Sequence, residues 1–264
     1  RIHRKIQRRM GADYQPEVPL KTELERENYV LVLEGRADGV IVRDGQTTID
    51  EIKGIYQDVN LLEGPVLVHL AQAKCYAYIL ASQQGLAEIS VQLTYCNLDT
   101  EEIRRFQEHY SFEEISAWFF SVVADYDKWA EFQYRARQER NLSIEGLEFP
   151  FPYREGQRDL TIGVYRTISR GKTLFIQAPT GTGKTITTVF PAVKAVGQGL
   201  ADKVFYLTAR TITRTVAKEA FDLLRTRGYQ GRVLIITAKE KLCLCEEMDC
   251  NPANCPYARG HYDR

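Results

Sequence analysis

The first part of the chain alternates apolar and polar positions in a way that predicts β-strands, with one helical segment between them. An Asp-Gly pair at 44 and 45 separates two β-rich runs, which is a strong signal for a β-hairpin. Apolar residues alternate with polar ones again between Ile89 and Tyr95. In chain order the pattern predicts a basic helix at 1–10, strands at 29–42 and 47–53, a helix at 65–80 and a strand at 89–95.

After these strands, the spacing of the apolar residues changes from that of a strand to that of a helix. Aromatic and apolar residues between 112 and 140 recur at helical spacing, which favours a core or interdomain helix over a platform of ligand-binding aromatic side chains. The stretch 141–146 is typical of a linker, and Pro150 and Pro152 exclude a helix over 149–153. We therefore predict an α/β domain over 1–110, a helical connector and linker over 111–148, and a second domain over 149–264.

In the second half, short apolar runs alternate with helical segments. The runs at 173–176, 204–207 and 233–236 predict buried strands, and helices are predicted to end near 168, 196 and 224. This alternation indicates a parallel sheet whose ligand lies at the carboxyl ends of the strands. The expected fold class is α/β in both halves.

The composition narrows the class of protein but identifies no partner. The chain has 264 residues, 44% of them hydrophobic, and 35 Lys and Arg against 35 Asp and Glu give a formal net charge of +0. Because there is no overall basic excess, a nucleic-acid partner has to be inferred from local residues. No apolar run approaches membrane-spanning length and no signal peptide is visible, so we expect a cytoplasmic protein without membrane contact. Both ends indicate a chain cut from a longer one.

One stretch, between a predicted strand and a predicted helix, carries the plainest chemical signal: Ala178-Pro179-Thr180-Gly181-Thr182-Gly183-Lys184-Thr185. Its glycines allow backbone N–H groups to point at phosphate oxygens, and the helix adds its positive N-terminal end. Lys184 is expected to reach the β- and γ-phosphates, and Thr185 to ligate Mg²⁺. Alanine stands at the position where the general pattern has glycine. We predict a P-loop that binds ATP·Mg²⁺ through residues 180–185.

A second group of chemical side chains lies on the predicted hairpin. Asp38 on the first strand, and Glu51 and Lys53 on the second, have the parity to meet at one end of the hairpin. Asp50 has the opposite parity and is expected to face away. Two carboxylates can hold a hard divalent cation such as Mg²⁺ or Mn²⁺, and an ammonium beside them can orient or activate a water for attack on a phosphodiester.

These residues, in order and spacing, resemble the RecB-type branch of the PD-(D/E)xK nucleases over about residues 1–100. The matching elements are His3, Gly35-Arg-Ala-Asp38, Glu51-Ile-Lys53 and Gln72-x-x-x-Tyr76. The resemblance implies that the histidine, the aspartate and the glutamate bind the metal and that the lysine assists catalysis. It also implies that the helix carrying the Gln and Tyr packs along the DNA.

Four of the six cysteines crowd near the end of the chain, at Cys243, Cys245, Cys250 and Cys255. Their clustering beside a nucleotide site favours a metal site in a reduced compartment over a disulfide framework. The final Cys-Pro pair is typical of iron–sulfur ligation, whereas zinc ribbons more often have paired C-x-x-C spacings.

The second half resembles the start of the XPD/DinG group of superfamily-two DNA helicases over about residues 149–264. The matching elements are Gln157, the P-loop, Leu207-Thr-Ala-Arg210-Thr and the cysteines after the third predicted strand. The resemblance implies a partial RecA-like P-loop NTPase domain with a cysteine-rich insert that holds a [4Fe-4S] cluster, and a nucleotide contact for Gln157. Arg210 and Arg214, at a strand's carboxyl end, are candidates for phosphate contacts with nucleic acid, although solvated surface arginines are an alternative.

Two parts of that group's pattern are not found before Arg264, an Asp-Glu-x-His strand and a second motor domain. We therefore expect this chain alone to bind ATP without appreciable hydrolysis. The cysteine spacing is also tighter than is usual in that group, so the resemblance implies that a fourth cluster ligand lies beyond residue 264. The predicted function is that of a nuclease–helicase acting on single-stranded DNA in repair or defence. The alternative is a non-catalytic DNA-binding adaptor with a degenerate nuclease site and a nucleotide-switched P-loop, and the sequence beyond Arg264 would discriminate between the two.

Overall fold

The computed structural model describes residues 2–179, 181–209 and 211–259, with the side chains of 211–213 outside that description. The chain divides into two compact units, Arg1–Tyr134 and Arg135–Arg264, which we treat separately. The first is a mixed α/β unit, and the described part of the second is helical. Among the described residues, no helix has the length and apolarity needed to cross a bilayer.

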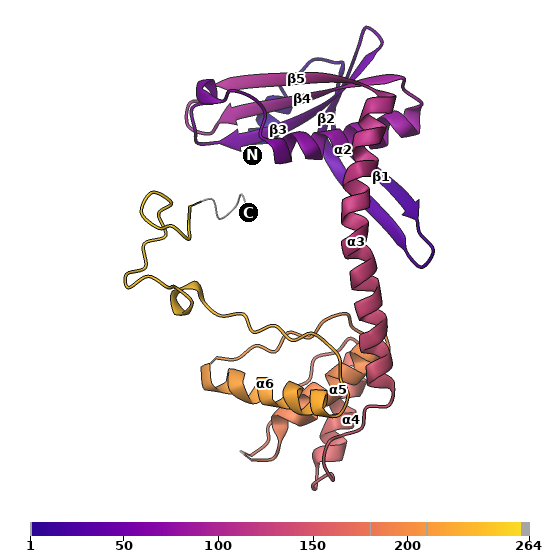
Figure 1. The fold of residues 1–264 in the computed structure, drawn as a ribbon, viewed down its shortest axis with the longest axis vertical. Helices are drawn as coiled ribbons and strands as arrows, with labels where there is room; N and C mark the ends of the chain where they lie inside the picture. Colours follow the sequence, from indigo (N-terminus) through magenta and orange to yellow (C-terminus); the bar gives the residue numbers. More distant parts are fainter. Residues whose placement is uncertain (1, 180, 210, 260–264) are drawn as a thin grey trace. The chain divides into compact units, whose positions relative to one another are not determined.

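Unit 1 is built on a five-stranded mixed sheet in the order β1-β2-β3-β4-β5. Its strands are β1 (Tyr14–Glu25), β2 (Val30–Arg43), β3 (Gln46–Ile55), β4 (Glu88–Asn97) and β5 (Ile103–Ser111). Its helices are α1 (Ile2–Gln7), a short 3-10 helix (Val59–Leu61), α2 (Leu67–Gln84) and the first part of α3 (Phe112–Glu145). Only β3 and β4 run parallel, and α2 is the crossover between them (Figure 1).

The hairpin predicted at Asp44-Gly45 is confirmed as the β2–β3 turn. Asp44 and Gly45 have φ angles of 51° and 78° between the paired residues Arg43 and Gln46. Positive φ at both central positions is the geometry that matches the twist of two antiparallel strands. The predicted helix at 65–80 and the strand at 89–95 are also present, as α2 and β4.

The core of unit 1 lies between the sheet and one face of α2. Ala73 and Ala77 are fully buried there, and their small side chains let the helix approach the strands closely. Ile49, Val91 and Leu93 supply the facing apolar surface from β3 and β4. The sheet therefore presents alternate residues of β3 to α2 and the remaining ones to the opposite face.

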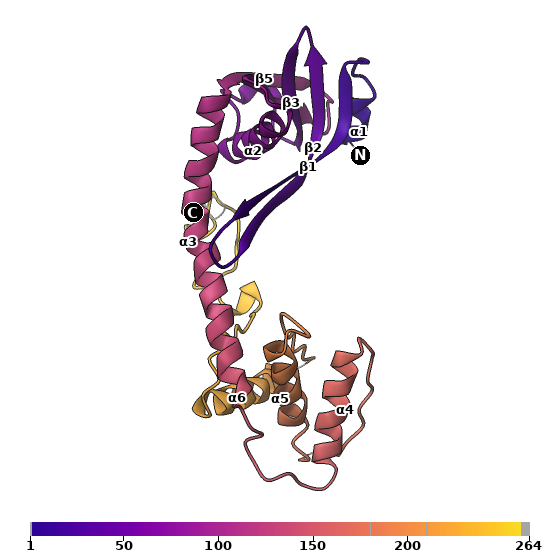
Figure 2. The same ribbon diagram turned by 90° about the vertical axis from the view of Figure 1, so that its right-hand side faces the viewer.

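β1 and β2 extend beyond the rest of the sheet as a two-stranded arm. β2 pairs with β3 only from Gly39 to Arg43, whereas β1 and β2 pair over almost their whole length (Figure 2). Arg26 near the tip of the arm donates to Asp127 of α3 through Nε at 2.8 Å and through a second guanidinium nitrogen at 2.6 Å. The arm thus crosses α2 and is fixed at its far end to α3.

Unit 2 contains the last part of α3, α4 (Gln157–Ser169), α5 (Lys184–Gly197), α6 (Thr211–Thr226) and a short 3-10 helix (Lys239–Lys241). Its apolar core joins the end of α3 to α5, α6 and the segment that follows α6. The buried residues are Ile144, Leu147, Val189, Phe190, Val193, Ala220, Phe221, Leu224 and Tyr229.

The parallel sheet predicted for the second half is wrong for the described residues. The runs 173–176, 204–207 and 233–236 form no strand, and Phe175, Leu207 and Leu234 are 93%, 88% and 84% exposed. A parallel strand is stable when neighbours bond both of its edges and helices cover both of its faces. Here α5 packs against both α4 and α6 instead.

The stretch 141–146, predicted as a linker, is also different in the structure. α3 continues to Glu145, and Ile144 is 2% exposed in the core of unit 2. Ser143 Oγ donates to the carbonyl of Arg140 at 2.6 Å, which is a helical contact. The polar composition suggested a linker, but burial of one apolar residue stabilises the last turn of the helix.

Candidate active site

The site of unit 1 begins where β2 separates from β3. The β1–β2 ladder is interrupted opposite Asp38, and the residue across from it, Glu17, has a φ of 55°, which is rare outside glycine. Buried positions change parity here, because Leu33 and Ala37 pack in the core before Asp38, and Val40 does so after it. The predicted alternation of β2 therefore does not hold across Asp38.

Asp38 caps the strand edge that β2 leaves open. Its Oδ2 accepts the backbone N–H of Ile52 at 2.8 Å, beyond the last residue pair of β2 and β3. Its Oδ1 lies 2.8 Å from Nδ1 of His3 on α1. The predicted metal ligands His3 and Asp38 are therefore neighbours, and Asp38 lies against the backbone next to Glu51.

Glu51 is the least satisfied polar group of the site. Its side chain is 3% exposed, and its Oε1 accepts from Lys53 Nζ at 2.8 Å. Its Oε2 is buried and has no hydrogen-bond partner among the described residues. Burial raises the pKa of Glu51, and the nearby Asp38 carboxylate raises it further against the opposing effect of Lys53. A hard cation would bind to such a buried carboxylate oxygen and supply the partner that its lone pair lacks.

Helix α2 faces Glu51 and Lys53 from the other side of the site and contributes Gln72 and Tyr76. Lys53 Nζ also donates to Gln72 Oε1 at 2.9 Å, and Gln72 Nε2 donates to the Tyr76 hydroxyl at 3.3 Å. A Cβ at Gly35 would lie 2.6 Å from that hydroxyl, so only glycine leaves room for the ring. The structure therefore brings Gln72 and Tyr76, which were predicted to share one face of the helix, next to Lys53.

His69 belongs to the same face of α2 and was not predicted. Its Nδ1 lies 3.1 Å from the Tyr95 hydroxyl, which accepts the N–H of Val66 at 2.9 Å. Burial lowers the pKa of His69, and the charge of Lys53 lowers it further, so the neutral ring is favoured. The signal in the sequence was its position one turn before Gln72.

Asp50 faces away from this group, as its parity predicted. Its carboxylate accepts hydrogen bonds from Tyr14, Gln92 and Thr94 at 3.2, 2.9 and 2.6 Å. Burial raises its pKa against these three bonds, which favour the ionised form. Glu51 and Asp50, adjacent in sequence, therefore have distinct surroundings on the two faces of the sheet.

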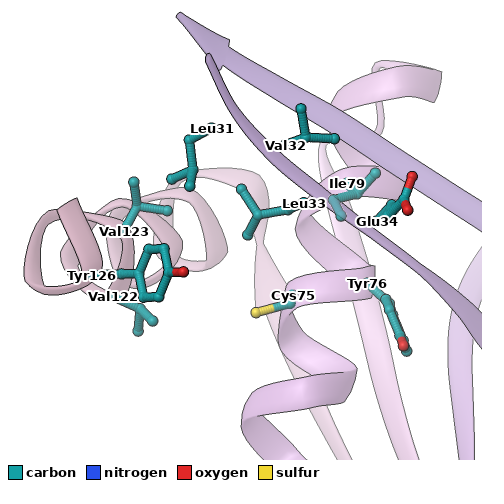
Figure 3. A pocket seen from close by; sticks show the side chains of 10 residues that line it. All are labelled: Leu31, Val32, Leu33, Glu34, Cys75, Tyr76, Ile79, Val122, Val123 and Tyr126. Carbon is teal, nitrogen blue, oxygen red and sulfur yellow. The ribbon is translucent and has the colours of Figure 1, made fainter. Parts of the chain in front are cut away.

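An apolar groove of about 420 Å³ adjoins the site, between the arm, α2 and α3 (Figure 3). It is lined by Leu31, Val32, Leu33, Glu34, Cys75, Tyr76, Ile79, Val122, Val123 and Tyr126. Tyr76 belongs both to the groove and, through Gln72, to the chain of hydrogen bonds that ends at Lys53. The groove therefore starts beside the polar site.

In unit 2 the stretch predicted to be a P-loop leads directly into α5, with Thr180 outside the described residues. Gly181 and Gly183 have φ angles of 82° and 74°, and α5 begins at Lys184. Lys184 Nζ donates to the carbonyls of Ala178 and Pro179 at 2.9 and 2.5 Å. The ammonium is thus held within its own loop, where a phosphate would compete with these carbonyls.

Gln157 packs against the same loop. Its Nε2 donates to the carbonyl of Thr182 at 2.8 Å, and its Oε1 accepts the N–H of Arg154 at 2.9 Å. A Cβ at Gly183 would lie 2.7 Å from Gln157 Nε2, so the contact needs glycine at this position. Thr185, the remaining predicted ligand, lies in the first turn of α5.

Of the other residues predicted to act in unit 2, some of the cysteines lie near one another, and Arg214 contacts Thr237. The thiol of Cys245 lies beside those of Cys255 and Cys243, and burial together with these neighbours raises its pKa. The backbone N–H of Ala258 lowers the pKa of Cys255. Arg214 donates to Thr237 Oγ1 at 3.1 Å, and Arg210 lies outside the described residues.

Within the described ranges, no group of three or more His, Cys, Asp or Glu side chains is placed so as to hold a metal ion. Neither the cysteines of unit 2 nor the set of His3, Asp38 and Glu51 forms such a group. The orphan Oε2 of Glu51 and the close His3–Asp38 pair nevertheless fit a divalent cation in the chemistry of their donors.

Comparison with known proteins adds little. No family model matches the chain, and no curated protein does. One solved structure, described as "Crystal structure of SSO0001", is similar with 22% sequence identity and a TM-score of 0.33. The match covers 43% of this chain and 52% of that one, so it spans about half of the solved chain. A likeness of this size supports no functional conclusion.

Proposed function

We propose that unit 1 is a metal-dependent DNA nuclease domain of the PD-(D/E)xK type, in the RecB-like branch. The single observation that supports it best is Glu51 Oε2, a buried acceptor without a partner among the described residues, beside a second carboxylate and a lysine. An uncompensated buried oxygen costs about 1–3 kcal/mol, more when charged. Retaining such a group makes physical sense when a cation occupies the site in the working enzyme.

Each residue has a role in this proposal. Asp38 and Glu51 hold Mg²⁺ or Mn²⁺ with His3 as a third ligand, and the cation, when bound, stabilises charge on the phosphate. Lys53 orients the attacking water, because its ammonium donates to Glu51 and Gln72 and keeps a third hydrogen available. Gln72 holds Lys53 in place, and His69 supplies a neutral ring on the same face of α2.

Single-stranded DNA is the proposed substrate. Tyr76 and Tyr126 line the apolar groove that adjoins the site, and unpaired bases stack on aromatic rings at about 1–3 kcal/mol each. Duplex DNA would have to unstack before its bases entered such a groove. The test is incubation of the whole chain with labelled single-stranded and duplex DNA, with Mg²⁺ or with EDTA. Cleavage of the single strand that requires metal is expected, and intact DNA under all conditions would contradict the proposal.

The pH dependence of metal binding follows from Glu51. Because burial raises its pKa, the metal-free carboxyl keeps its proton above the ordinary value of 4.5. The protonated form stabilises the metal-free fold below that value, and this contribution is lost as pH rises through the raised pKa. Mg²⁺ affinity should therefore increase over the same interval, as measured by calorimetric titration across a pH series. Glu51→Gln should abolish both the binding and its pH dependence, whereas a pH-independent affinity would contradict this account.

A second function is proposed for unit 2, nucleotide binding as part of an ATP-driven motor of the XPD/DinG type. The φ angles of Gly181 and Gly183, the 14-residue helix starting at Lys184 and the contact of Gln157 with the loop support nucleotide binding. The alternative, a non-catalytic DNA-binding adaptor with a degenerate nuclease site and a nucleotide-switched P-loop, is separated from the nuclease proposal by the cleavage assay above.

The cysteines are proposed to hold a [4Fe-4S] cluster, which needs four thiolate ligands. The thiol of Cys245 lies beside those of Cys243 and Cys255, and Cys250 is half-buried nearby in sequence. Protein purified without oxygen is expected to contain iron and acid-labile sulfide, measured by elemental and sulfide analysis. Stoichiometric zinc without iron would show that the thiols hold the other metal they suit.

A further inference from the structure

A buried hydrogen-bond network lies on the face of β3 opposite Glu51 and Lys53. We call Tyr14, Gly39, Asp50, Gln92 and Thr94 the back-face network. Asp50 is its centre, fully buried, and accepts from Tyr14 of β1 and from Gln92 and Thr94 of β4. The carboxylate of Asp50 on β3 therefore links three strands, because its donors lie on β1 and on β4.

The ring of Tyr14 reaches Asp50 only because of Gly39. Tyr14 pairs with Ile41, and Gly39 pairs with Asp50, so the phenol has to cross Gly39 diagonally. A Cβ at Gly39 would lie 2.0 Å from the Tyr14 hydroxyl oxygen and from Cζ, closer than real contacts allow. Gly39 has no positive φ, so this glycine is needed for space and not for its backbone conformation.

The position of this network in the sequence links it to the metal ligands. Gly39 follows Asp38, and Asp50 precedes Glu51. Gly39↔Asp50 is also the last residue pair of β2 and β3 before β2 leaves the sheet. Beyond it, Asp38 is held against β3 by its own contact with the Ile52 N–H and by His3. The spacing of the two carboxylates therefore depends on how firmly Gly39 and Asp50 are fixed.

We propose that the Tyr14–Asp50 hydrogen bond across Gly39 is a positioning device that sets the separation of the Asp38 and Glu51 carboxylates for their cation. This inference rests on the proposed nuclease function. Tyr14 and Asp50 touch neither metal nor DNA, and they act through the backbone of their neighbours. Supporting contacts of this kind change metal affinity by about 10- to 100-fold in other sites.

The test is Mn²⁺ binding by the whole chain without DNA, followed by electron paramagnetic resonance of the free ion. Tyr14→Phe keeps the ring and removes one hydrogen bond, and it should weaken Mn²⁺ binding about tenfold. Gly39→Ala displaces the ring and should weaken binding by a similar factor. Ser90→Ala is the control, since it removes a hydrogen bond of another buried β4 residue, to the exposed His109 at 3.0 Å, outside the network.

Thermal unfolding of each variant separates positioning from stability. The expected result is weaker Mn²⁺ binding in Tyr14→Phe and Gly39→Ala, and unchanged binding in Ser90→Ala even where unfolding temperatures fall alike. Wild-type Mn²⁺ affinity in Tyr14→Phe would overturn the inference and leave the nuclease proposal standing. Failure of the wild-type chain to bind Mn²⁺ would overturn both.

Discussion

Glu51→Ala is expected to abolish metal-dependent cleavage of single-stranded DNA. The change removes the buried Oε2 that we assign to the cation, together with the acceptor of Lys53 at 2.8 Å. A metal ion contributes several kcal/mol to the transition state and each 1.4 kcal/mol is about tenfold in rate, so the loss should be about a thousandfold or more. The measurement is the initial rate of cleavage by the whole chain at saturating Mg²⁺. Lys53→Ala should reduce the rate comparably without weakening Mg²⁺ binding to the same extent.

Asp50→Asn is the matched control for this prediction. Asp50 is the neighbour of Glu51, carries the same charge and is as deeply buried, but it bonds to Tyr14, Gln92 and Thr94 on the other face. We expect it to raise the Mg²⁺ concentration required and to retain cleavage at saturation. Loss of cleavage at saturating Mg²⁺ in Asp50→Asn, with a wild-type rate in Glu51→Ala, would reverse the assignment of the two faces.

Lys184→Ala is expected to abolish ATP binding by unit 2. The lysine is the cation of the loop, and its ammonium now bonds to the carbonyls of Ala178 and Pro179. A charge-assisted hydrogen bond to phosphate contributes about 1.5–3 kcal/mol, so affinity should fall by at least about tenfold. The measurement is the fluorescence of a labelled ATP analogue titrated with the whole chain and Mg²⁺.

Lys172→Ala provides the comparison, because this exposed lysine precedes the apolar run that leads to the loop. It should bind the analogue as the wild type does. Equal affinities for Lys184→Ala and the wild type would exclude the P-loop as the nucleotide site. Rapid ATP turnover by this chain would contradict the expectation that binding occurs without appreciable hydrolysis.

Local signals predicted the centre of the unit 1 sheet well. The turn at Asp44-Gly45 and the opposite orientations of Asp50 and Glu51 follow from positive φ at the turn and from the period of two along a strand. Both are properties of neighbouring residues, so no knowledge of the rest of the fold is required. The hydrogen bond of Lys53 to Gln72 was not predicted, because it depends on how α2 packs against β3.

The two edge strands of that sheet were missed for a physical reason. β1 contains Pro16 and Pro19, and prolines are tolerated at an edge where one side of the strand needs no donor. β5 is rich in charged residues, which are frequent on exposed edges. Neither strand has the clean apolar alternation of a half-buried strand. Because β1 was missed, the arm and the role of Tyr14 in holding Asp50 were missed as well.

The second half shows the opposite error. Its apolar runs have the composition of buried strands, but burial depends on what covers them, and Phe175 and Leu207 are exposed in the described residues. Apolar composition alone therefore overpredicts sheet. The glycine turn and the start of the following helix were predicted correctly because both are local features, as the φ angles of Gly181 and Gly183 and the start of α5 at Lys184 show.

The most direct test of the central claim is the position of a cation in unit 1. Crystals of the whole chain soaked in Mn²⁺ should show an anomalous scattering peak within about 2.2 Å of Glu51 Oε2 and an Asp38 carboxylate oxygen. Such a peak would assign the orphan oxygen to the metal that the nuclease proposal requires. Full occupancy of Mn²⁺ elsewhere in the chain, with Glu51 Oε2 still without a ligand, would contradict it.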